Sequence, residues 1–107
     1  LPHILSRLNR EYEHRRDELP KLTKPPEEYI RDQFYLSTQP LGEFRDPQDM
    51  QRLISIVGAD SILFSTDFPH YDLDTPKTVE NLLSPLSVED RDQIMHGNAL
   101  EIFDLPA

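Results

Sequence analysis

The chain has 107 residues, of which 36% are hydrophobic and 29% charged, and this composition supports one modest core. It carries 11 Lys and Arg residues against 20 Asp and Glu residues, and a net charge of −9 argues against a nucleic-acid partner. No apolar run approaches the roughly 18 to 20 residues that span a bilayer, so we expect no membrane partner. The absence of cysteine excludes disulfides and thiolate metal sites and fits a soluble, cytoplasmic protein. Because the first residue is Leu1 and not Met, we expect a piece of a longer protein.

The first third of the chain predicts one long helix and one short helical turn. Apolar side chains recur at helical spacing over residues 1–12, which indicates an amphipathic helix that ends near Pro20. In residues 21–31, Pro25 and Pro26 leave room only for a short helical turn, because each proline biases the preceding residue toward extended geometry.

The middle of the chain predicts a strand–helix–strand unit. Residues 33–38 are rich in aromatic and β-favouring side chains and predict a strand. Asp46 and Pro47 are typical of a helix start, and Gly58 is typical of a helix end. Residues 61–66 contain three consecutive large apolar side chains, which predict a strand buried on both faces, as in parallel sheets. We therefore expect two parallel strands joined by a helix.

More helices are predicted after the second strand. One helix begins at Thr75 and is interrupted by Pro85. The next begins with a capping box at Ser87 and ends at Gly97, and Asn98 caps a last short turn. Two parallel strands cannot cover their own edges and faces. We therefore expect the missing strands to come from an absent amino-terminal portion or from another copy of the chain.

One carboxylate occupies a position that is informative about function. Asp67 follows the second predicted strand directly, and the carboxyl ends of parallel strands face the ligand site in α/β proteins. The alternative is that Asp67 only caps a turn or the next helix. His70 could ligate a metal, carry a proton or hydrogen-bond within the turn. The other histidines lie at unrelated spacings, so we expect them to be exposed or capping residues: His3, His14 and His96.

Two segments of the chain resemble a known family. Residues 61–70 read SILFSTDFPH, residues 94–99 read IMHGNA, and Phe103 follows. This combination resembles the carboxyl-terminal part of the amidohydrolase-related metal-dependent hydrolases, in the branch with aminocarboxymuconate-semialdehyde decarboxylase and the resorcylate decarboxylases. The resemblance implies an α/β fold, the carboxyl-terminal portion of a (β/α)8 TIM-like barrel. Residues 1–107 would form a single segment with its last two to three βα units.

The resemblance also implies roles for three residues. Asp67 would end the eighth strand, contact a divalent metal, expected to be zinc, or its bound water, and act in proton transfer. His70 and Asn98 would supply supporting hydrogen bonds around that strand. The His-x-His pair of the family has no counterpart in these residues. Since Asp67 alone cannot hold a catalytic zinc, we expect the isolated chain to be empty and inactive.

The sequence leaves three functions open. The first is part of a metal-dependent hydrolase or decarboxylase that acts on a small organic molecule. The second is a non-catalytic acidic helical module that self-associates or binds a protein partner through unpaired strand edges and apolar faces. The third is an inactive remnant in which Asp67 only shapes a turn.

Overall fold

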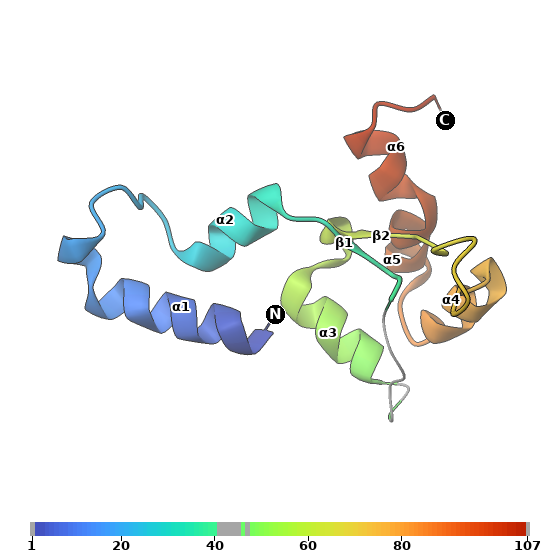
Figure 1. Cartoon of the computed structure of the whole chain (residues 1–107), viewed down its shortest axis with the longest axis horizontal. Coiled ribbons are helices and arrows are strands. Elements are labelled where there is room, and N and C mark those ends of the chain that lie inside the picture. Colours follow the sequence, from blue (N-terminus) through green and yellow to red (C-terminus); the bar gives the residue numbers. More distant parts are fainter. Residues whose placement is uncertain (1, 41–45, 47, 107) are drawn as a thin grey trace. The chain divides into compact units, whose positions relative to one another are not determined.

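The computed structural model describes residues 2–40, 46 and 48–106 (Figure 1). Contacts group the chain into two compact units, Leu1–Phe34 and Tyr35–Ala107. Each unit is described by itself below.

The first unit consists of two helices and a turn. Helix α1 (Pro2–His14) is followed by a 3-10 turn, η1 (Arg16–Glu18), and by helix α2 (Pro26–Gln33). Leu5 and Tyr12 are buried, and their spacing of seven residues places them on one face of α1. The predicted amphipathic helix is confirmed, although it ends at His14 and not near Pro20.

Helix α2 is longer than the short turn that the sequence predicts. It begins at Pro26. Proline lacks a backbone N–H, but an N–H in the first helical turn would have no acceptor within the helix, so no hydrogen bond is lost. Pro25 stays extended, with φ −60° and ψ 148°, as expected for a residue before proline. Asn9 of α1 supports the start of α2, since its Oδ1 accepts a hydrogen bond from the backbone N–H of Glu27 at 3.2 Å. This contact between the helices is what sequence reasoning on residues 21–31 alone missed.

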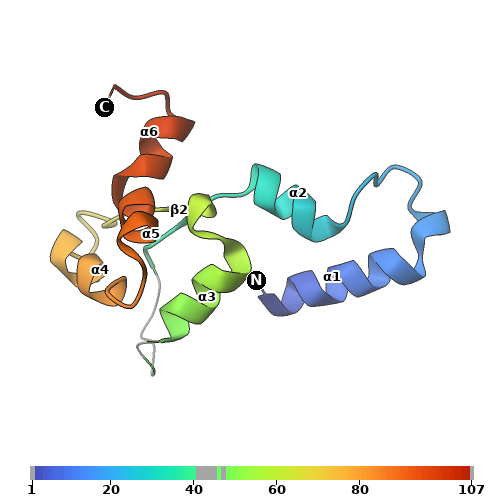
Figure 2. The ribbon, with the colours of Figure 1, turned by 180° about the vertical axis from the view of Figure 1, so that it is seen from behind.

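The second unit contains a small parallel sheet and helices, shown from opposite sides in Figures 1 and 2. Within the part of the chain that the structure describes, its main elements are β1 (Leu36–Ser37), α3 (Asp49–Val57), β2 (Ile62–Leu63), α4 (Pro76–Leu82), α5 (Val88–Asp92) and α6 (Asn98–Ile102).

The two strands pair in parallel, which confirms the predicted strand–helix–strand unit. Leu36 lies opposite Ile62 and Ser37 opposite Leu63. The backbone N–H of Thr38 extends the ladder by donating to Leu63 O at 2.9 Å.

Both strands are shorter than predicted, with two residues each. Gln33 is the last residue of α2, and the backbone N–H of Phe34 still bonds Ile30 O of that helix. On the other strand, Ser61 belongs to a 3-10 turn, η2 (Ala59–Ser61). The residues at the starts of both predicted strands therefore belong to helical hydrogen bonding, although their composition favours β-structure.

Helix α3 starts and ends close to the predicted points. Asp46 Oδ1 accepts a hydrogen bond from the backbone N–H of Gln48 at 2.9 Å, just before the helix begins at Asp49. Pro47 lies outside the described residues. Gly58 follows the helix with φ +94°, a backbone conformation that residues with a side chain adopt only under strain.

The core of the second unit combines α3, β2, α4, the residues just after α4 and Ile94 of the last helical stretch. Val79 and Leu83 are completely buried. The buried members of this cluster are Met50, Ile54, Val57, Ile62, Val79, Leu83, Leu86 and Ile94.

The predicted caps of α4 and α5 are confirmed. The Thr75 side chain accepts a hydrogen bond from the backbone N–H of Thr78 at 3.2 Å, and Ser87 Oγ accepts one from that of Asp90 at 3.0 Å. These bonds satisfy amide groups that would otherwise have no partner in the first helical turn.

The predicted helix end at Gly97 and the predicted cap at Asn98 are wrong. Instead of stopping, the chain passes from α5 through a π-helical turn, η3 (Gln93–Gly97), directly into α6. Gly97 has helical angles, φ −56° and ψ −49°. A Cβ at Gly97 would lie 2.7 Å from Oε1 at the flexible end of the Gln93 side chain, and the glycine makes no left-handed turn here.

Candidate functional site

The carboxyl ends of β1 and β2 lie at the same edge of the sheet and are tied together. Thr38, which is completely buried, follows β1, and Ser65 follows β2. Thr38 Oγ1 donates to Ser65 O at 3.1 Å and accepts from the Ser65 N–H at 2.9 Å. This pair of bonds fixes where the loop after β2 begins.

The loop of residues 66–74 is closed by its own backbone. The N–H of Asp74 donates to Thr66 O at 3.1 Å, and the N–H of His70 donates to Asp67 O at 2.8 Å. Asp67 has φ +57°, in the left-handed region that Asp tolerates better than most residues. Asp67 therefore turns the chain at the strand exit, as the turn interpretation requires, and also presents its side chain there.

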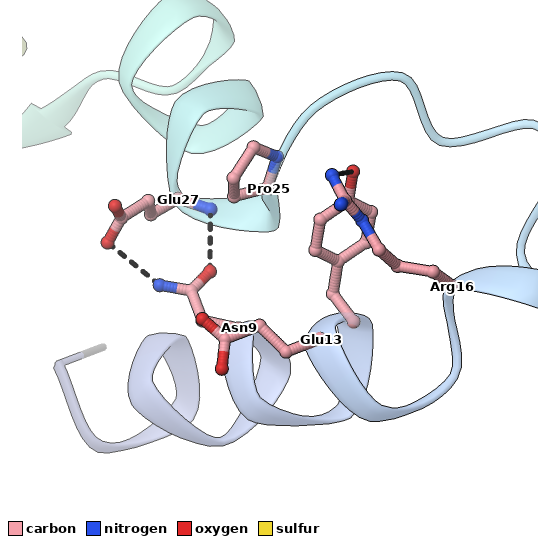
Figure 3. Close-up of a pocket in the computed structure, with 6 residues that line it drawn as sticks. Asn9, Glu13, Arg16, Pro25 and Glu27 are labelled. Carbon is pink, nitrogen blue, oxygen red and sulfur yellow. Dashed lines mark hydrogen bonds between the residues drawn. The ribbon is translucent and has the colours of Figure 1, made fainter.

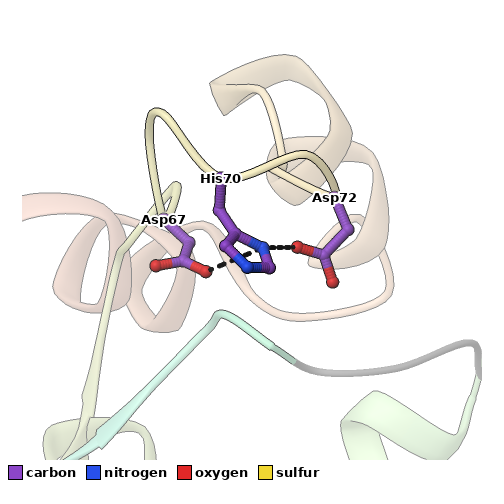
Figure 4. A group of neighbouring side chains, drawn as sticks. All are labelled: Asp67, His70 and Asp72. Carbon is purple, nitrogen blue, oxygen red and sulfur yellow. Dashed lines mark hydrogen bonds and ion pairs between the residues drawn. The ribbon is translucent and has the colours of Figure 1, made fainter.

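Three metal-ligating side chains of this loop converge, and Figure 4 shows them facing one another. One ligand atom each from Asp67, His70 and Asp72 lies within 4.8 Å of the others, and all three residues are exposed. His70 Nδ1 bonds Asp72 Oδ1 and lies 3.7 Å from Asp67 Oδ2. Two carboxylates and an imidazole form a partial ligand set that suits a divalent cation such as zinc or manganese.

Electrostatics in this Asp67–His70–Asp72 cluster favour the charged imidazole. The hydrogen bond with Asp72 is the main cause that raises the pKa of His70, partial desolvation opposes it, and the negative charges of Asp72 and Asp67 add to the rise. A proton on His70 and a cation at the cluster exclude each other at Nδ1, so the two compete.

Sequence reasoning singled out Asp67 and His70 but missed Asp72. The structure brings the first two together and adds Asp72 two residues after His70. The signal that could have found it is the spacing Asp-x-x-His-x-Asp after a strand.

Asn98 lies at the other end of β2. It is only 2% exposed, and its Nδ2 donates to Ile62 O at 2.6 Å and to Ala59 O at 2.7 Å. Its Oδ1 accepts from Gln93 Nε2 at 2.5 Å. Asn98 therefore holds the start of β2 and does not reach the Asp67–His70–Asp72 cluster at the strand exit.

A surface pocket in the first unit offers no comparable chemistry (Figure 3). Asn9 and Glu27 in it bond each other, with Asn9 Nδ2 donating to Glu27 Oε2 at 2.8 Å. Arg16 donates to the hydroxyl of Tyr12 at 3.2 Å and lies over its ring, 5.0 Å from the centroid. These side chains hold the helices and the turn of this unit together.

The remaining histidines behave as the sequence predicts. His3, His14 and His96 are all exposed. Among the residues with a described position, the Asp67–His70–Asp72 cluster is the one group of three converging His, Asp or Glu side chains. In that same part of the chain, no helix has the length and apolar character needed to cross a membrane.

Comparison with known proteins identifies the family. Residues 2–105 match the amidohydrolase family. The chain belongs to this family. It is 39% identical over 79 residues to a gamma-resorcylate decarboxylase of Polaromonas sp. (strain JS666 / ATCC BAA-500), an alignment that covers 73% of this chain and 23% of that protein. It is also similar to the solved structure of an amidohydrolase from Mycobacterium avium subsp. paratuberculosis K-10, with a TM-score of 0.71 and 25% identity over 98% of this chain and 24% of that one.

These similarities confirm the resemblance and the fold class predicted from the sequence. This amidohydrolase-family chain is helix-rich with two parallel strands in its described part, as expected for the carboxyl-terminal portion of a TIM-like barrel. The chain spans about a quarter of the length of the relatives it matches. Amidohydrolases generally use divalent metals, and the donor set at the exit of β2 fits such an ion.

Proposed function

We propose that this chain is the carboxyl-terminal barrel segment of a metal-dependent hydrolase or decarboxylase that acts on a small organic substrate. Residues 1–107 would supply its last two to three βα units. The similarity to a gamma-resorcylate decarboxylase supports carboxy-lyase chemistry, and the family match supports hydrolysis as the alternative.

The position of Asp67 carries this proposal. In a barrel, catalytic groups gather at the carboxyl ends of the strands, and residues at the opposite ends serve stability. Asp67 follows β2 at the edge where β1 also ends, and it lies beside His70 and Asp72. The residue that the resemblance implies as catalytic therefore stands among further metal-ligating groups.

Each residue has a distinct part in the proposed site. A bound divalent ion, with zinc as the first choice, lowers the pKa of a coordinated water toward neutrality. Asp67 holds the ion or accepts a proton at its carboxylate. His70 lies between the carboxylates of Asp67 and Asp72 and sets their charge balance. Asn98 supports the strand from its far end.

The chain alone supplies an incomplete site in this proposal. The proposal assigns the metal contact to Asp67, and a single carboxylate cannot hold a catalytic zinc, which takes three protein ligands and keeps an open position for water. The exposed Asp67–His70–Asp72 cluster has no wall around it to exclude water in the described residues. We therefore expect the isolated chain to be inactive and the other ligands to come from the missing barrel portion.

Replacement of Asp67 in the whole protein tests the proposal. Asp67→Asn keeps the size of the side chain and the tolerance for a left-handed backbone, but it removes the charge and the proton acceptor. Turnover should fall by about 100-fold or more, the scale of general acid–base contributions.

Asp104→Asn is the matched control, because Asp104 is also exposed and has φ +50° but lies outside the cluster. It should leave turnover unchanged. Equal turnover for Asp67→Asn and Asp104→Asn would reduce Asp67 to a turn residue and support the inactive-remnant alternative.

A second candidate function is self-association or binding of a protein partner. Large aromatic side chains of the second unit are exposed: Phe68 by 78%, Tyr71 by 92% and Phe103 by 63%. Exposed aromatic groups favour coverage by another polypeptide. Sedimentation that finds a folded monomer of the 107-residue chain at micromolar concentration would remove self-association.

A further inference from the structure

We propose that Gln39 is a positioning residue that fastens the loop of residues 66–74, and with it the Asp67–His70–Asp72 cluster, to the end of β1. This inference rests on the proposed function of that cluster. Gln39 was not among the candidates that sequence reasoning selected, because its partners lie more than 30 residues away.

The contacts of Gln39 reach the far end of the loop. Gln39 follows Thr38 in the sequence and is 8% exposed. Gln39 Nε2 donates to the backbone carbonyl of Asp72 at 2.8 Å and to Asp74 Oδ2 at 3.0 Å. Thr38 holds Ser65 at the near end of the same loop. Thr38 and Gln39, two consecutive residues after β1, therefore hydrogen-bond to the beginning and to the end of the loop.

The hydrogen-bonding pattern fixes how the Gln39 amide is oriented. Both of its partners, Asp72 O and Asp74 Oδ2, are acceptors, so only the NH2 group can face them. The opposite orientation would place Oε1 against a carbonyl and a carboxylate. The consequence is that Gln39 Oε1 is buried without a hydrogen-bond partner among the residues that the structure describes.

The buried Oε1 atom indicates that Gln39 positions the loop and does not merely fill space. A buried acceptor without a partner is unfavourable, and an apolar side chain such as Met would fill similar space without it. The gain from Gln39 must therefore lie in the two bonds to the loop. Since one of them holds the backbone of Asp72, whose carboxylate bonds His70, Gln39 sets where these side chains lie relative to Asp67.

Amide hydrogen exchange of the 107-residue chain tests this inference through two variants. Gln39→Met removes both loop bonds, and Gln39→Glu keeps the shape but turns an acceptor toward Asp74 and the Asp72 carbonyl. Exchange should become about 10-fold faster or more at the amides of His70 and Leu73, whose hydrogen bonds belong to the loop. The amides of Val79 and Leu83 in and after α4 are internal controls and should not change.

A compensating variant separates this contact from a general loss of stability. Gln39→Glu combined with Asp74→Asn exchanges donor and acceptor across the pair of residues 39 and 74 but leaves the Asp72 carbonyl without a donor. Exchange at His70 and Leu73 should therefore slow in part relative to Gln39→Glu alone. Unchanged loop exchange in both single variants, an equal rise at Val79 and Leu83, or no recovery in the double variant would each overturn the inference.

Activity of the whole protein keeps this test distinct from that of the proposed function. Gln39→Met should lower kcat by about 10-fold with little change in KM, because it displaces the site without removing a ligand. If Asp67→Asn leaves turnover intact, the proposed function fails and the exchange data still decide the role of Gln39. If Asp67→Asn abolishes turnover while the Gln39 variants retain normal kcat and exchange, only the role of Gln39 fails.

Discussion

The two ends of β2 differ in the burial and hydrogen bonding of the polar side chains beside them. At the start of the strand, Asn98 is buried and donates to two backbone carbonyls. At the exit, Asp67, His70 and Asp72 are exposed and held by one another and by a closed loop. In barrel enzymes, residues at the amino ends of the strands serve stability and residues at the carboxyl ends serve catalysis. Substitutions at the two ends should therefore affect different measurements.

The largest expected effect on stability comes from Asn98→Leu. The variant leaves the carbonyls of Ala59 and Ile62 without the amide that bonds them, and buried unpaired acceptors each cost about 1 to 3 kcal/mol. We expect a loss of roughly 2 to 4 kcal/mol in the free energy of unfolding, measured by urea denaturation.

The control for this experiment is Asn81→Leu, an exposed asparagine of α4. Its effect should stay within about 0.5 kcal/mol. Equal unfolding free energies for the Asn98→Leu and Asn81→Leu variants would show that the start of β2 does not depend on this side chain.

Gly58→Ala should have an intermediate effect. Gly58 has φ +94°, and an added Cβ would lie 2.5 Å from Asp60 Oδ1, so the backbone is strained even if the Asp60 side chain moves. Strain of this kind costs about 1 to 3 kcal/mol. Gly97→Ala is the matched variant, because Gly97 already has helical angles and its contact, Gln93 Oε1, ends a flexible side chain. A thermal melt in which Gly97→Ala is the more destabilising of the two would contradict this account of the glycines.

The smallest effect concerns the titration of His70 at the exit of β2. Its pKa is raised chiefly by the hydrogen bond with Asp72, so Asp72→Asn should lower the pKa, and Asp67→Asn should lower it less. Because the fold raises this pKa, the contribution to stability is complete below the unfolded-state pKa and is lost as pH rises through the folded-state pKa. NMR titration of the imidazole measures the shift. A pKa that is insensitive to Asp72→Asn would remove the proposed coupling within the cluster.

The parts of the fold that local patterns encode could be predicted from the sequence. The stop of α3 at Gly58 and the caps at Thr75 and Ser87 depend on neighbouring residues, and the structure confirms them. Helix α3 itself begins at Asp49, three residues after the predicted start at Asp46. The parallel pairing of the strands followed from their composition and spacing.

The error at the last helices occurred where a distant contact overrides the local signal. Gly97 and Asn98 have the sequence of a helix end, but the bonds of Asn98 to Ala59 and Ile62 keep the chain helical. At the predicted first strand the competing signal was local, since Gln33 ends α2 and the Phe34 N–H bonds Ile30 O of that helix. Local propensity is a weak prior when a buried polar side chain can be satisfied across the fold.

The candidate site was predictable in part for the same reason. A carboxylate directly after a strand is a local pattern, and it pointed to Asp67. Asp72 belongs to a local spacing, Asp-x-x-His-x-Asp, that sequence reasoning did not use. Gln39 carried no local signal, since its bonds reach residues 33 and 35 positions away. Asp67 is therefore the residue on which the proposed function depends most.

A crystal structure of the whole protein grown with Mn²⁺ or Zn²⁺ tests that dependence most directly, because anomalous scattering locates the ion. The account predicts an active-site ion with a carboxylate oxygen of Asp67 about 2.0 to 2.2 Å away or joined to it by one bound water. A fully occupied ion in the barrel with the Asp67 side chain turned away from it, beyond reach of a bridging water, would contradict the account.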